Sequence, residues 1–312
     1  MRTITKLFLS SMLLVNGTMA LAHSDGGFVD KDFFKGMKKD DKAAILMVHF
    51  GTTFDDTRAL TIDRINEKVK KEFKNVDVKE AYTSRIIMRR LKERGIVKLN
   101  PQEVLDELKA QGYTHVLVQG TNIMNGVESE NLKNEVASYE ASFKDIRLGA
   151  PLLTEAHDYE KVAKAIAEKI GPLKENQGVV LVGHGTHHFG GSAYAMMDYV
   201  FSAEGYENYA VGTVEGYPEF DNVVKKLKDR GVKDVILMPF MFVAGDHAQN
   251  DIAGDWNENL QKAGFTVSKV ILMGLGQNED IQNIYVDHIK FITHHKPEDI
   301  ASKKVQYSKE KD

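Results

Sequence analysis

The chain has 312 residues, of which 42% are hydrophobic and 28% are charged, and this composition predicts about two globular domains with a substantial core. It excludes an intrinsically disordered chain, a collagen and a membrane bundle. The formal net charge of -4 indicates no basic face for nucleic acid, and the lack of cysteine excludes disulfides, thiolate metal sites and thiol catalysis.

Residues 1–22 have the pattern of a secretory signal peptide. Arg2 and Lys6 supply positive charge, residues 7–19 are mostly apolar, and Ala20-Leu21-Ala22 has the small-x-small form of a cleavage site. The apolar run is shorter than the roughly 20 residues that span a bilayer, which disfavours the alternative of an uncleaved anchor. We therefore expect a mature chain that is exported to the periplasm and does not insert into the membrane.

From Ala43 onward, short apolar runs alternate with amphipathic stretches, which is the pattern of strands joined by crossover helices. The first half predicts strands at 44–50, 76–82, 115–119 and 146–153, with helices at 58–73 and 102–111. The second half predicts strands at 179–182, 210–214, 235–238 and 267–273, with helices at 194–201 and 220–230. The expected fold class is α/β, with two similar flavodoxin-like or Rossmann-like domains, parallel four-stranded sheets and an active cleft between them.

The two halves can be aligned with each other. Phe50-Gly51-Thr52 matches His184-Gly185-Thr186 after the first strand of each half, and residues 112–126 match 231–245 around the third strand. Chance similarity is the alternative, because glycine after a helix or a strand is common in such folds. We predict an N-terminal domain at 40–172, a C-terminal domain at 178–295 that carries a metal site, and a charged tail at 296–312.

Three polar side chains follow three strands of the second half. His184 follows the first strand, Glu215 closes the second, and His247 follows the third. Ligands of an open parallel sheet bind outside the carboxyl ends of its strands, so we expect these side chains to lie close together. Two imidazoles and one carboxylate suit divalent Co, Fe, Ni or Zn and do not suit Ca or Mg. The alternative reading of each histidine is an ordinary hydrogen-bonding loop residue, and it is stronger for His187 and His188.

Other chemistries have little motif support. The chain has no GxxxxGK[ST] phosphate loop, no GxSxG nucleophile elbow and no HExxH zinc motif. A hydrolase or mutase that handled phosphate at the His184-Gly185 pair would need nearby arginines, and none adjoins His184 in the sequence.

Several stretches resemble the anaerobic sirohydrochlorin cobaltochelatases of the CbiK family, which are class II chelatases. They are Met47-Val48-His49-Phe50-Gly51-Thr52-Thr53, Ala81-Tyr82-Thr83-Ser84, Gly183-His184-Gly185, Val214-Glu215-Gly216-Tyr217-Pro218 and, above all, Met238 to Ala248 (MPFMFVAGDHA). The resemblance runs from about Ala43 to His295. It implies the chelatase fold and the ATP-independent insertion of Co²⁺, with Fe²⁺ as the second candidate metal, into sirohydrochlorin in cobalamin or tetrapyrrole biosynthesis.

The resemblance also implies residue roles. His184, Glu215 and His247 correspond to the metal-binding and catalytic residues of the family, and no nucleotide is needed. The chain departs from the family at His49, where Ser is frequent, and at Asn122, where His is frequent. We expect these two residues to contact the tetrapyrrole and Arg85 to pair with its carboxylates; the alternative for Arg85 is an ordinary solvated charge on a helix.

The expected partners are sirohydrochlorin or a related tetrapyrrole and a divalent metal, with no nucleic acid. The sequence leaves a homo-oligomer open. Because of the leader and the two departures, a periplasmic tetrapyrrole or metal carrier built on the same fold is the alternative function.

Overall fold

The computed structural model of the protein describes residues 27–245, 248–298, 304–305 and 308–309. The predicted signal peptide and His247 lie outside this range, and the predicted tail is described only in part. Two compact units are present: Lys31–Lys296, and a second unit that combines Met1–Asp30 with Pro297–Asp312. In the described part of the chain, no helix is both long and apolar enough to span a bilayer.

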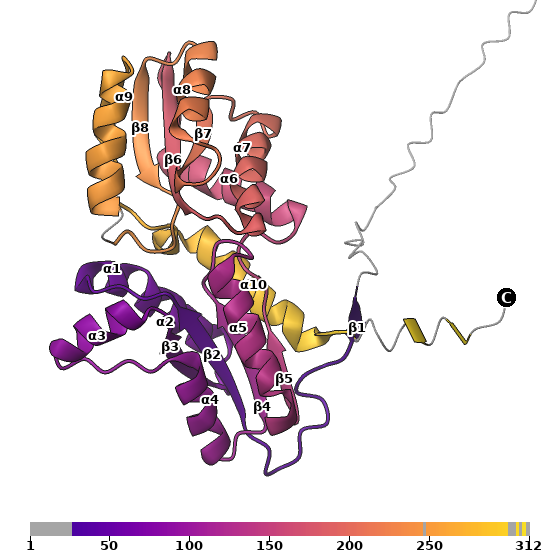
Figure 1. Ribbon diagram of the computed structural model, residues 1–312. Helices are drawn as coiled ribbons and strands as arrows, with labels where there is room; N and C mark the ends of the chain where they lie inside the picture. The colour runs from indigo at the N-terminus through magenta and orange to yellow at the C-terminus, as the bar shows by residue number, and fades with distance from the viewer. Residues whose placement is uncertain (1–26, 246–247, 299–303, 306–307, 310–312) are drawn as a thin grey trace, which may run out of the picture. The chain divides into compact units, whose positions relative to one another are not determined.

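The larger unit holds two parallel sheets of four strands each (Figure 1). The first contains β2 (Ala43–His49), β3 (Asp77–Tyr82), β4 (His115–Gly120) and β5 (Asp145–Leu148), in the order β3-β2-β4-β5. The second contains β6 (Gln177–Gly185), β7 (Tyr209–Glu215), β8 (Asp234–Pro239) and β9 (Thr266–Val270), in the order β7-β6-β8-β9. The two sheets therefore share one topology, and the predicted fold class is confirmed. Two short strands lie outside them, β1 (Phe28–Asp30) and β10 (His295–Pro297).

Helices connect the strands. In the first half they are α1 (Asp55–Leu60), α2 (Ile62–Glu72), α3 (Arg85–Glu93), α4 (Pro101–Ala110), α5 (Val127–Ser138), η1 (Glu140–Ser142) and α6 (Ala156–Ile170). In the second half they are η2 (Phe189–Gly191), α7 (Ser192–Ala203), α8 (Phe220–Asp229), the π-helix η3 (Ala248–Trp256), α9 (Asn257–Lys262), η4 (Leu275–Gln277) and α10 (Glu279–His294).

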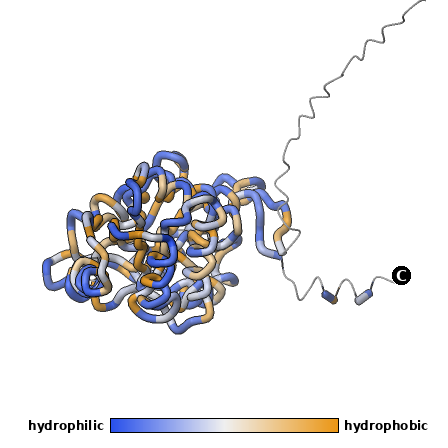
Figure 2. Tube along the Cα trace, turned by 90° about the horizontal axis from the view of Figure 1, so that it is seen from above, coloured by the Kyte–Doolittle hydropathy of each residue, from blue (hydrophilic) through white to orange (hydrophobic). Residues whose placement is uncertain are grey.

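The central strands β2, β4, β6 and β8 are buried on both faces, as expected for parallel strands covered by helices, whereas the edge strands β3 and β9 are mostly exposed or partly buried. Alternate residues of β2 point to different clusters: Ile45 and Met47 belong to one large cluster, whereas Leu46 belongs to another that includes α4 and α5 residues. The large cluster also contains Val179 and Leu181 of β6, so one apolar core is continuous between the two sheets. Orange and blue alternate along much of the tube in Figure 2, as expected for elements with one buried face.

Helix α10 belongs to the second half in sequence but packs on the first sheet. It contacts β4, α6 and α2. The Tyr285 hydroxyl donates hydrogen bonds to the carbonyl oxygens of Thr121 and Asn122, at 3.2 and 3.0 Å. The chain thus crosses between the halves a second time near its end. The domain limits 40–172 and 178–295 stay a prediction. They assign α10 to the C-terminal domain, although α10 packs on elements of the N-terminal one.

Some element limits differ from the predicted ones. The helix predicted at 58–73 is two helices, because Thr61 leaves helical geometry (φ -123°, ψ -77°). The strand predicted at 146–153 ends at Leu148; it is the edge strand β5, and Pro151 beyond it has no backbone N–H to donate to a ladder with β4. Helices α3, α5, α6 and α9 were not predicted.

Candidate metal site

His184 and Glu215 lie side by side at the carboxyl edge of the second sheet. They end adjacent parallel strands, and the register pairs Gly185 with Glu215. The Nδ1 atom of His184 is 3.6 Å from Oε1 of Glu215, and the two side chains are 47% and 48% exposed. The sheet register therefore brings together two of the three residues predicted to bind metal, with both side chains accessible to a ligand.

Glycine is required between them. Gly185 has φ +86°, and a Cβ atom there would lie 1.5 Å from the carbonyl oxygen of Glu215. The Gly185 amide donates a 3.2 Å hydrogen bond to the hydroxyl of Tyr194, which lies beneath it on α7. Burial raises the pKa of Tyr194, so the hydroxyl stays neutral. Backbone geometry and Tyr194 together fix where the two site side chains leave the sheet.

The imidazole of His184 has a defined tautomer. Its Nδ1 atom is 3.1 Å from the carbonyl oxygen of Gly185, which can only accept a hydrogen bond, so Nδ1 carries the proton. The lone pair of the neutral ring is then on Nε2. Metal-binding histidines commonly donate the other ring N–H to a carbonyl or carboxylate in this way.

The third predicted ligand, His247, lies outside the described residues. Within the ranges that the structure describes, no cluster of three or more His, Cys, Asp and Glu side chains could hold a metal ion. His184 and Glu215 therefore form an incomplete set, and the role of His247 stays a prediction.

His49 is buried in the core beneath the first sheet's carboxyl edge. Its side chain is 1% exposed, with Nδ1 3.0 Å from the Thr121 hydroxyl and Nε2 3.0 Å from Oδ1 of Asn66. Burial lowers the pKa of His49, so the ring is neutral. Its ring stacks on Phe242 with centroids 6.3 Å apart. An effect of His49 on tetrapyrrole binding would have to pass through these neighbours.

Asn122 and Arg85 also follow strands of the first sheet. Asn122 comes two residues after β4 and is partly exposed, and its backbone carbonyl oxygen accepts a hydrogen bond from the Tyr285 hydroxyl. Arg85 is the first residue of α3 and is exposed. Burial raises the pKa of Glu135 on α5, and the charge of Arg85 offsets part of that rise. Both residues thus stand at the edge where the sequence predicted them, and tetrapyrrole contact stays a prediction.

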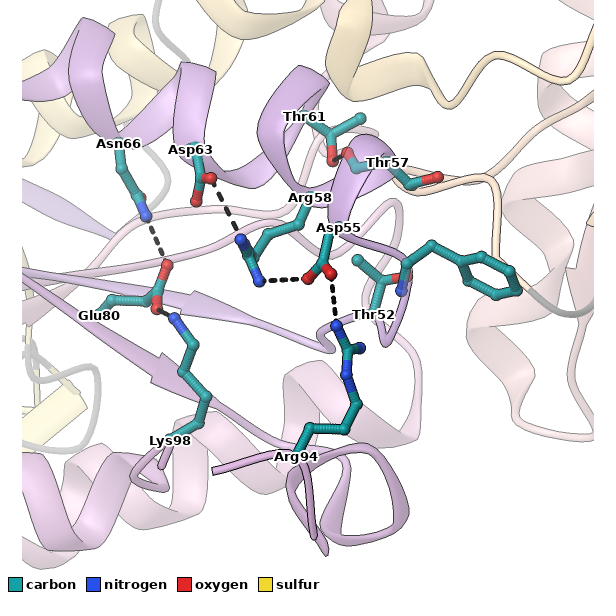
Figure 3. A network of polar contacts seen from close by, with 11 residues as sticks. Thr52, Asp55, Thr57, Arg58, Thr61, Asp63, Asn66, Glu80, Arg94 and Lys98 are labelled. Carbon is teal, nitrogen blue, oxygen red and sulfur yellow. Dashed lines mark hydrogen bonds and ion pairs between the residues drawn. The ribbon is translucent and has the colours of Figure 1, made fainter. Parts of the chain in front are cut away.

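A polar network fixes the segment between β2 and α1 (Figure 3). Asp55, in the first turn of α1, pairs with Arg58 at 2.9 Å and with Arg94, which also donates to the Thr53 carbonyl oxygen at 2.6 Å. The Thr57 hydroxyl donates to the carbonyl oxygen of Ala244, at 3.3 Å. The first half therefore contacts the segment that follows β8 directly.

A family model described as cobalt chelatase (CbiK) matches residues 43–294. The chain belongs to this family. It is 37% identical over 253 residues to a sirohydrochlorin cobaltochelatase of Salmonella typhimurium, covering 80% of this chain and 95% of the relative. It is 32% identical over 256 residues to the sirohydrochlorin cobaltochelatase CbiKC of Nitratidesulfovibrio vulgaris, covering 80% and 89%. The resemblance found in the sequence is thereby confirmed.

Solved chelatase structures share the fold of this CbiK-family chain. SirB from Bacillus subtilis with Fe³⁺ superposes with a TM-score of 0.58 at 14% identity, covering 81% of this chain and 96% of SirB. The sirohydrochlorin chelatase SirB of Bacillus subtilis subspecies spizizenii in complex with cobalt gives a TM-score of 0.57 at 13% identity, covering 81% and 95%. At such identities the likeness establishes the chelatase fold.

Proposed function

We propose that this protein is a sirohydrochlorin cobaltochelatase that inserts Co²⁺ without a nucleotide. The observation that carries the proposal is the pairing of His184 and Glu215 on adjacent strand ends, within a chain matched over residues 43–294 by the CbiK family. Relatives of 37% and 32% identity that bear this activity in their names support the same substrate and metal. Fe²⁺ is the second candidate metal.

Insertion requires the tetrapyrrole to lose two pyrrole protons and a divalent ion to be held weakly near one face of the ring. His184 would offer the Nε2 lone pair to the ion, and the same lone pair could accept one pyrrole proton once the ion has left, with the second proton passing to His247. Glu215 offsets the charge of the ion. We place His247 with them as the third ligand, since two imidazoles and a carboxylate suit a divalent transition metal.

The first half would hold the macrocycle. Large apolar side chains are exposed in the segments that follow its strands: Phe50 after β2, Ile86 in the first turn of α3 and Val127 at the start of α5, with exposed fractions of 50%, 56% and 51%. A flat tetrapyrrole has an apolar face and carboxylates at its rim, which such a surface and the exposed Arg85 would complement. Asn122 follows the third strand at the same edge. Phe50 occupies the place that His184 has in the second half, so the metal ligands are built on one side only.

The predicted leader would direct the mature chain to the periplasm, which we propose as its site of action. A periplasmic carrier of tetrapyrrole or metal is the second candidate, favoured by the same leader. The two candidates differ in turnover, because a carrier binds its cargo without catalysing repeated insertion.

The test measures metallated sirohydrochlorin by absorbance, with purified protein, Co²⁺ and an excess of tetrapyrrole. We expect multiple turnovers, and we expect His184→Ala to lose nearly all of them. His157→Ala is the matched control, since His157 is an exposed histidine on α6, paired with Glu160. Product that never exceeds the amount of protein would favour the carrier, and full activity in His184→Ala would remove His184 from the site.

A further inference from the structure

His188 and Glu130 join the segment after β6 to helix α5 of the first half. Nε2 of His188 lies 2.9 Å from Oε2 of Glu130, which is in the first turn of α5. The His188 side chain is 12% exposed and that of Glu130 is 51% exposed. The ring of Phe189 lies against His188, with centroids 4.0 Å apart. The imidazole of His188 is therefore largely covered, whereas that of His184, four residues earlier, is half-exposed.

The partners of His188 fix its tautomer. Its Nδ1 atom accepts a 3.0 Å hydrogen bond from the Gly190 amide, so a neutral ring carries its proton on Nε2 and donates it to Glu130. A hydrogen bond to a carboxylate is stronger than one between neutral groups. The contact between the halves is thus satisfied without a charge on the imidazole.

A second contact of the same segment lies two residues further on. A Cβ atom at Gly190 would be 2.1 Å from the carbonyl oxygen of Asn125, which belongs to the loop after β4. The backbone at Gly190 therefore lies so close to the first half that no side chain would fit there. At its other end, the Gly185 amide is held by the Tyr194 hydroxyl.

The internal repeat provides a counterpart that lacks this chemistry. Thr57, which follows the first strand of the first half, donates to Ala244, which follows the third strand of the second half. His188 follows the first strand of the second half, and Glu130 follows the third strand of the first half. Among the residues that the structure describes in these two segments, the contact that involves a charged group is His188–Glu130, on the side whose first-strand segment carries His184.

We propose that His188 is a positioning residue for metal binding: its hydrogen bond to Glu130 fixes the segment that begins at His184 and so holds that imidazole beside Glu215. The identity of the metal rests on the proposed function. The positioning role itself requires only that His184 and Glu215 bind a divalent ion.

The test compares Glu130→Ala, Glu130→Gln and His188→Ala with Glu160→Ala in the full chain. The control removes an exposed His–Glu contact of 3.0 Å within α6, away from the strand ends. Each protein is titrated with Co²⁺ alone, its melting temperature is measured, and the KM values for Co²⁺ and sirohydrochlorin are determined separately. We expect Glu130→Ala and His188→Ala to bind Co²⁺ about tenfold more weakly, in line with the effect of outer partners on metal ligands.

Glu130→Gln keeps an acceptor for the Nε2 proton, so its Co²⁺ affinity should stay within about threefold of the unchanged chain. The KM for Co²⁺ should rise in both alanine variants, with the KM for sirohydrochlorin unchanged. Co²⁺ affinity in Glu130→Ala and His188→Ala equal to that of Glu160→Ala would overturn the proposal, as would a loss in Glu130→Gln as large as in Glu130→Ala. If the unchanged chain failed to metallate sirohydrochlorin, the proposed function would fall, while the Co²⁺ titration would still decide the role of His188.

Discussion

The direction of a side chain at a strand end follows from the alternation along that strand. His184 and His49 both come at the carboxyl end of a central strand, yet His184 is half-exposed and His49 is buried. His49 continues the face of Ile45 and Met47, which points into the core shared with α10. The strand-end rule predicted the position of both residues, but the period of two could not predict their exposure, because both faces of β2 and β6 are buried.

Replacement of Glu215 should affect the binding of metal and not the binding of tetrapyrrole. We expect Glu215→Ala to weaken Co²⁺ binding by about tenfold or more, because a carboxylate ligand and its charge are lost. Tetrapyrrole affinity should change little, since the apolar edge of the first half is intact. Titrations with metal and with macrocycle, done separately, measure both. Unchanged Co²⁺ affinity in a folded Glu215→Ala protein would exclude this residue as a ligand.

His49 should make stability depend on pH. Burial lowers its pKa in the folded chain, so the unfolded chain takes up a proton below about pH 6.5 that the folded chain does not. The free energy of unfolding should therefore be fully maintained above that pH and fall as the pH decreases towards the folded pKa, by up to about 1.4 kcal/mol per pH unit. Urea unfolding at pH 7.5 and 5.5 measures the change. A His49→Gln variant should lose less stability over this interval, and equal losses would contradict the assignment.

The role of Arg147 depends on contacts with parts of the chain that are distant in sequence. Arg147 on β5 is fully buried, pairs with Asp145 at 2.8 Å, and donates to the carbonyl oxygens of Lys31 and Ile292 at 2.8 and 2.7 Å. The ring of Phe33 lies 5.1 Å from the guanidinium carbon. The apolar pattern predicted a strand here, but nothing local to Arg147 shows that it anchors both the start of the unit and the end of α10. For the same reason Glu130 could not be matched with His188 from sequence.

Loss of the Arg147 guanidinium should lower the free energy of unfolding. Arg147→Met removes the buried partner of Asp145, which keeps only the more exposed Lys296 and Lys31 at 3.3 and 3.9 Å, and leaves carbonyl oxygens unsatisfied, so we expect a loss of about 3 kcal/mol in the free energy of unfolding. Arg230→Met is the control, because its pair with Glu207 is exposed and should contribute about 1 kcal/mol or less. Denaturant unfolding of both variants measures the difference. Similar stability of the two variants would contradict an anchoring role for Arg147.

At the scale of the molecule, the sequence repeat predicted two similar halves, and the identical strand orders confirm them. The repeat succeeded because the turns that follow matching strands require the same backbone: Gly51 and Gly185 both have positive φ, +101° and +86°. It could not predict which helix covers which sheet. Packing between distant elements decided that, and α10 is the example.

The predicted leader decides where the whole chain is located. If residues 1–22 direct secretion, the mature chain should begin near His23 and be recovered from the periplasm. Mass analysis of the protein purified from a Gram-negative host measures its first residue. A chain that retains Met1 and stays with the membrane or the cytoplasm would contradict the predicted leader.

The return of α10 to the first sheet sets an order of events during synthesis. Domains usually fold as they emerge, the N-terminal one first. Here the core beside β2 and β4 stays open until Tyr285 and Ile289 have been translated, because both belong to the same cluster as Ile45. The half that is made first is therefore completed last. A nascent chain released before residue 279 would expose that apolar surface, and such a fragment should aggregate or require a chaperone, whereas the full chain should not.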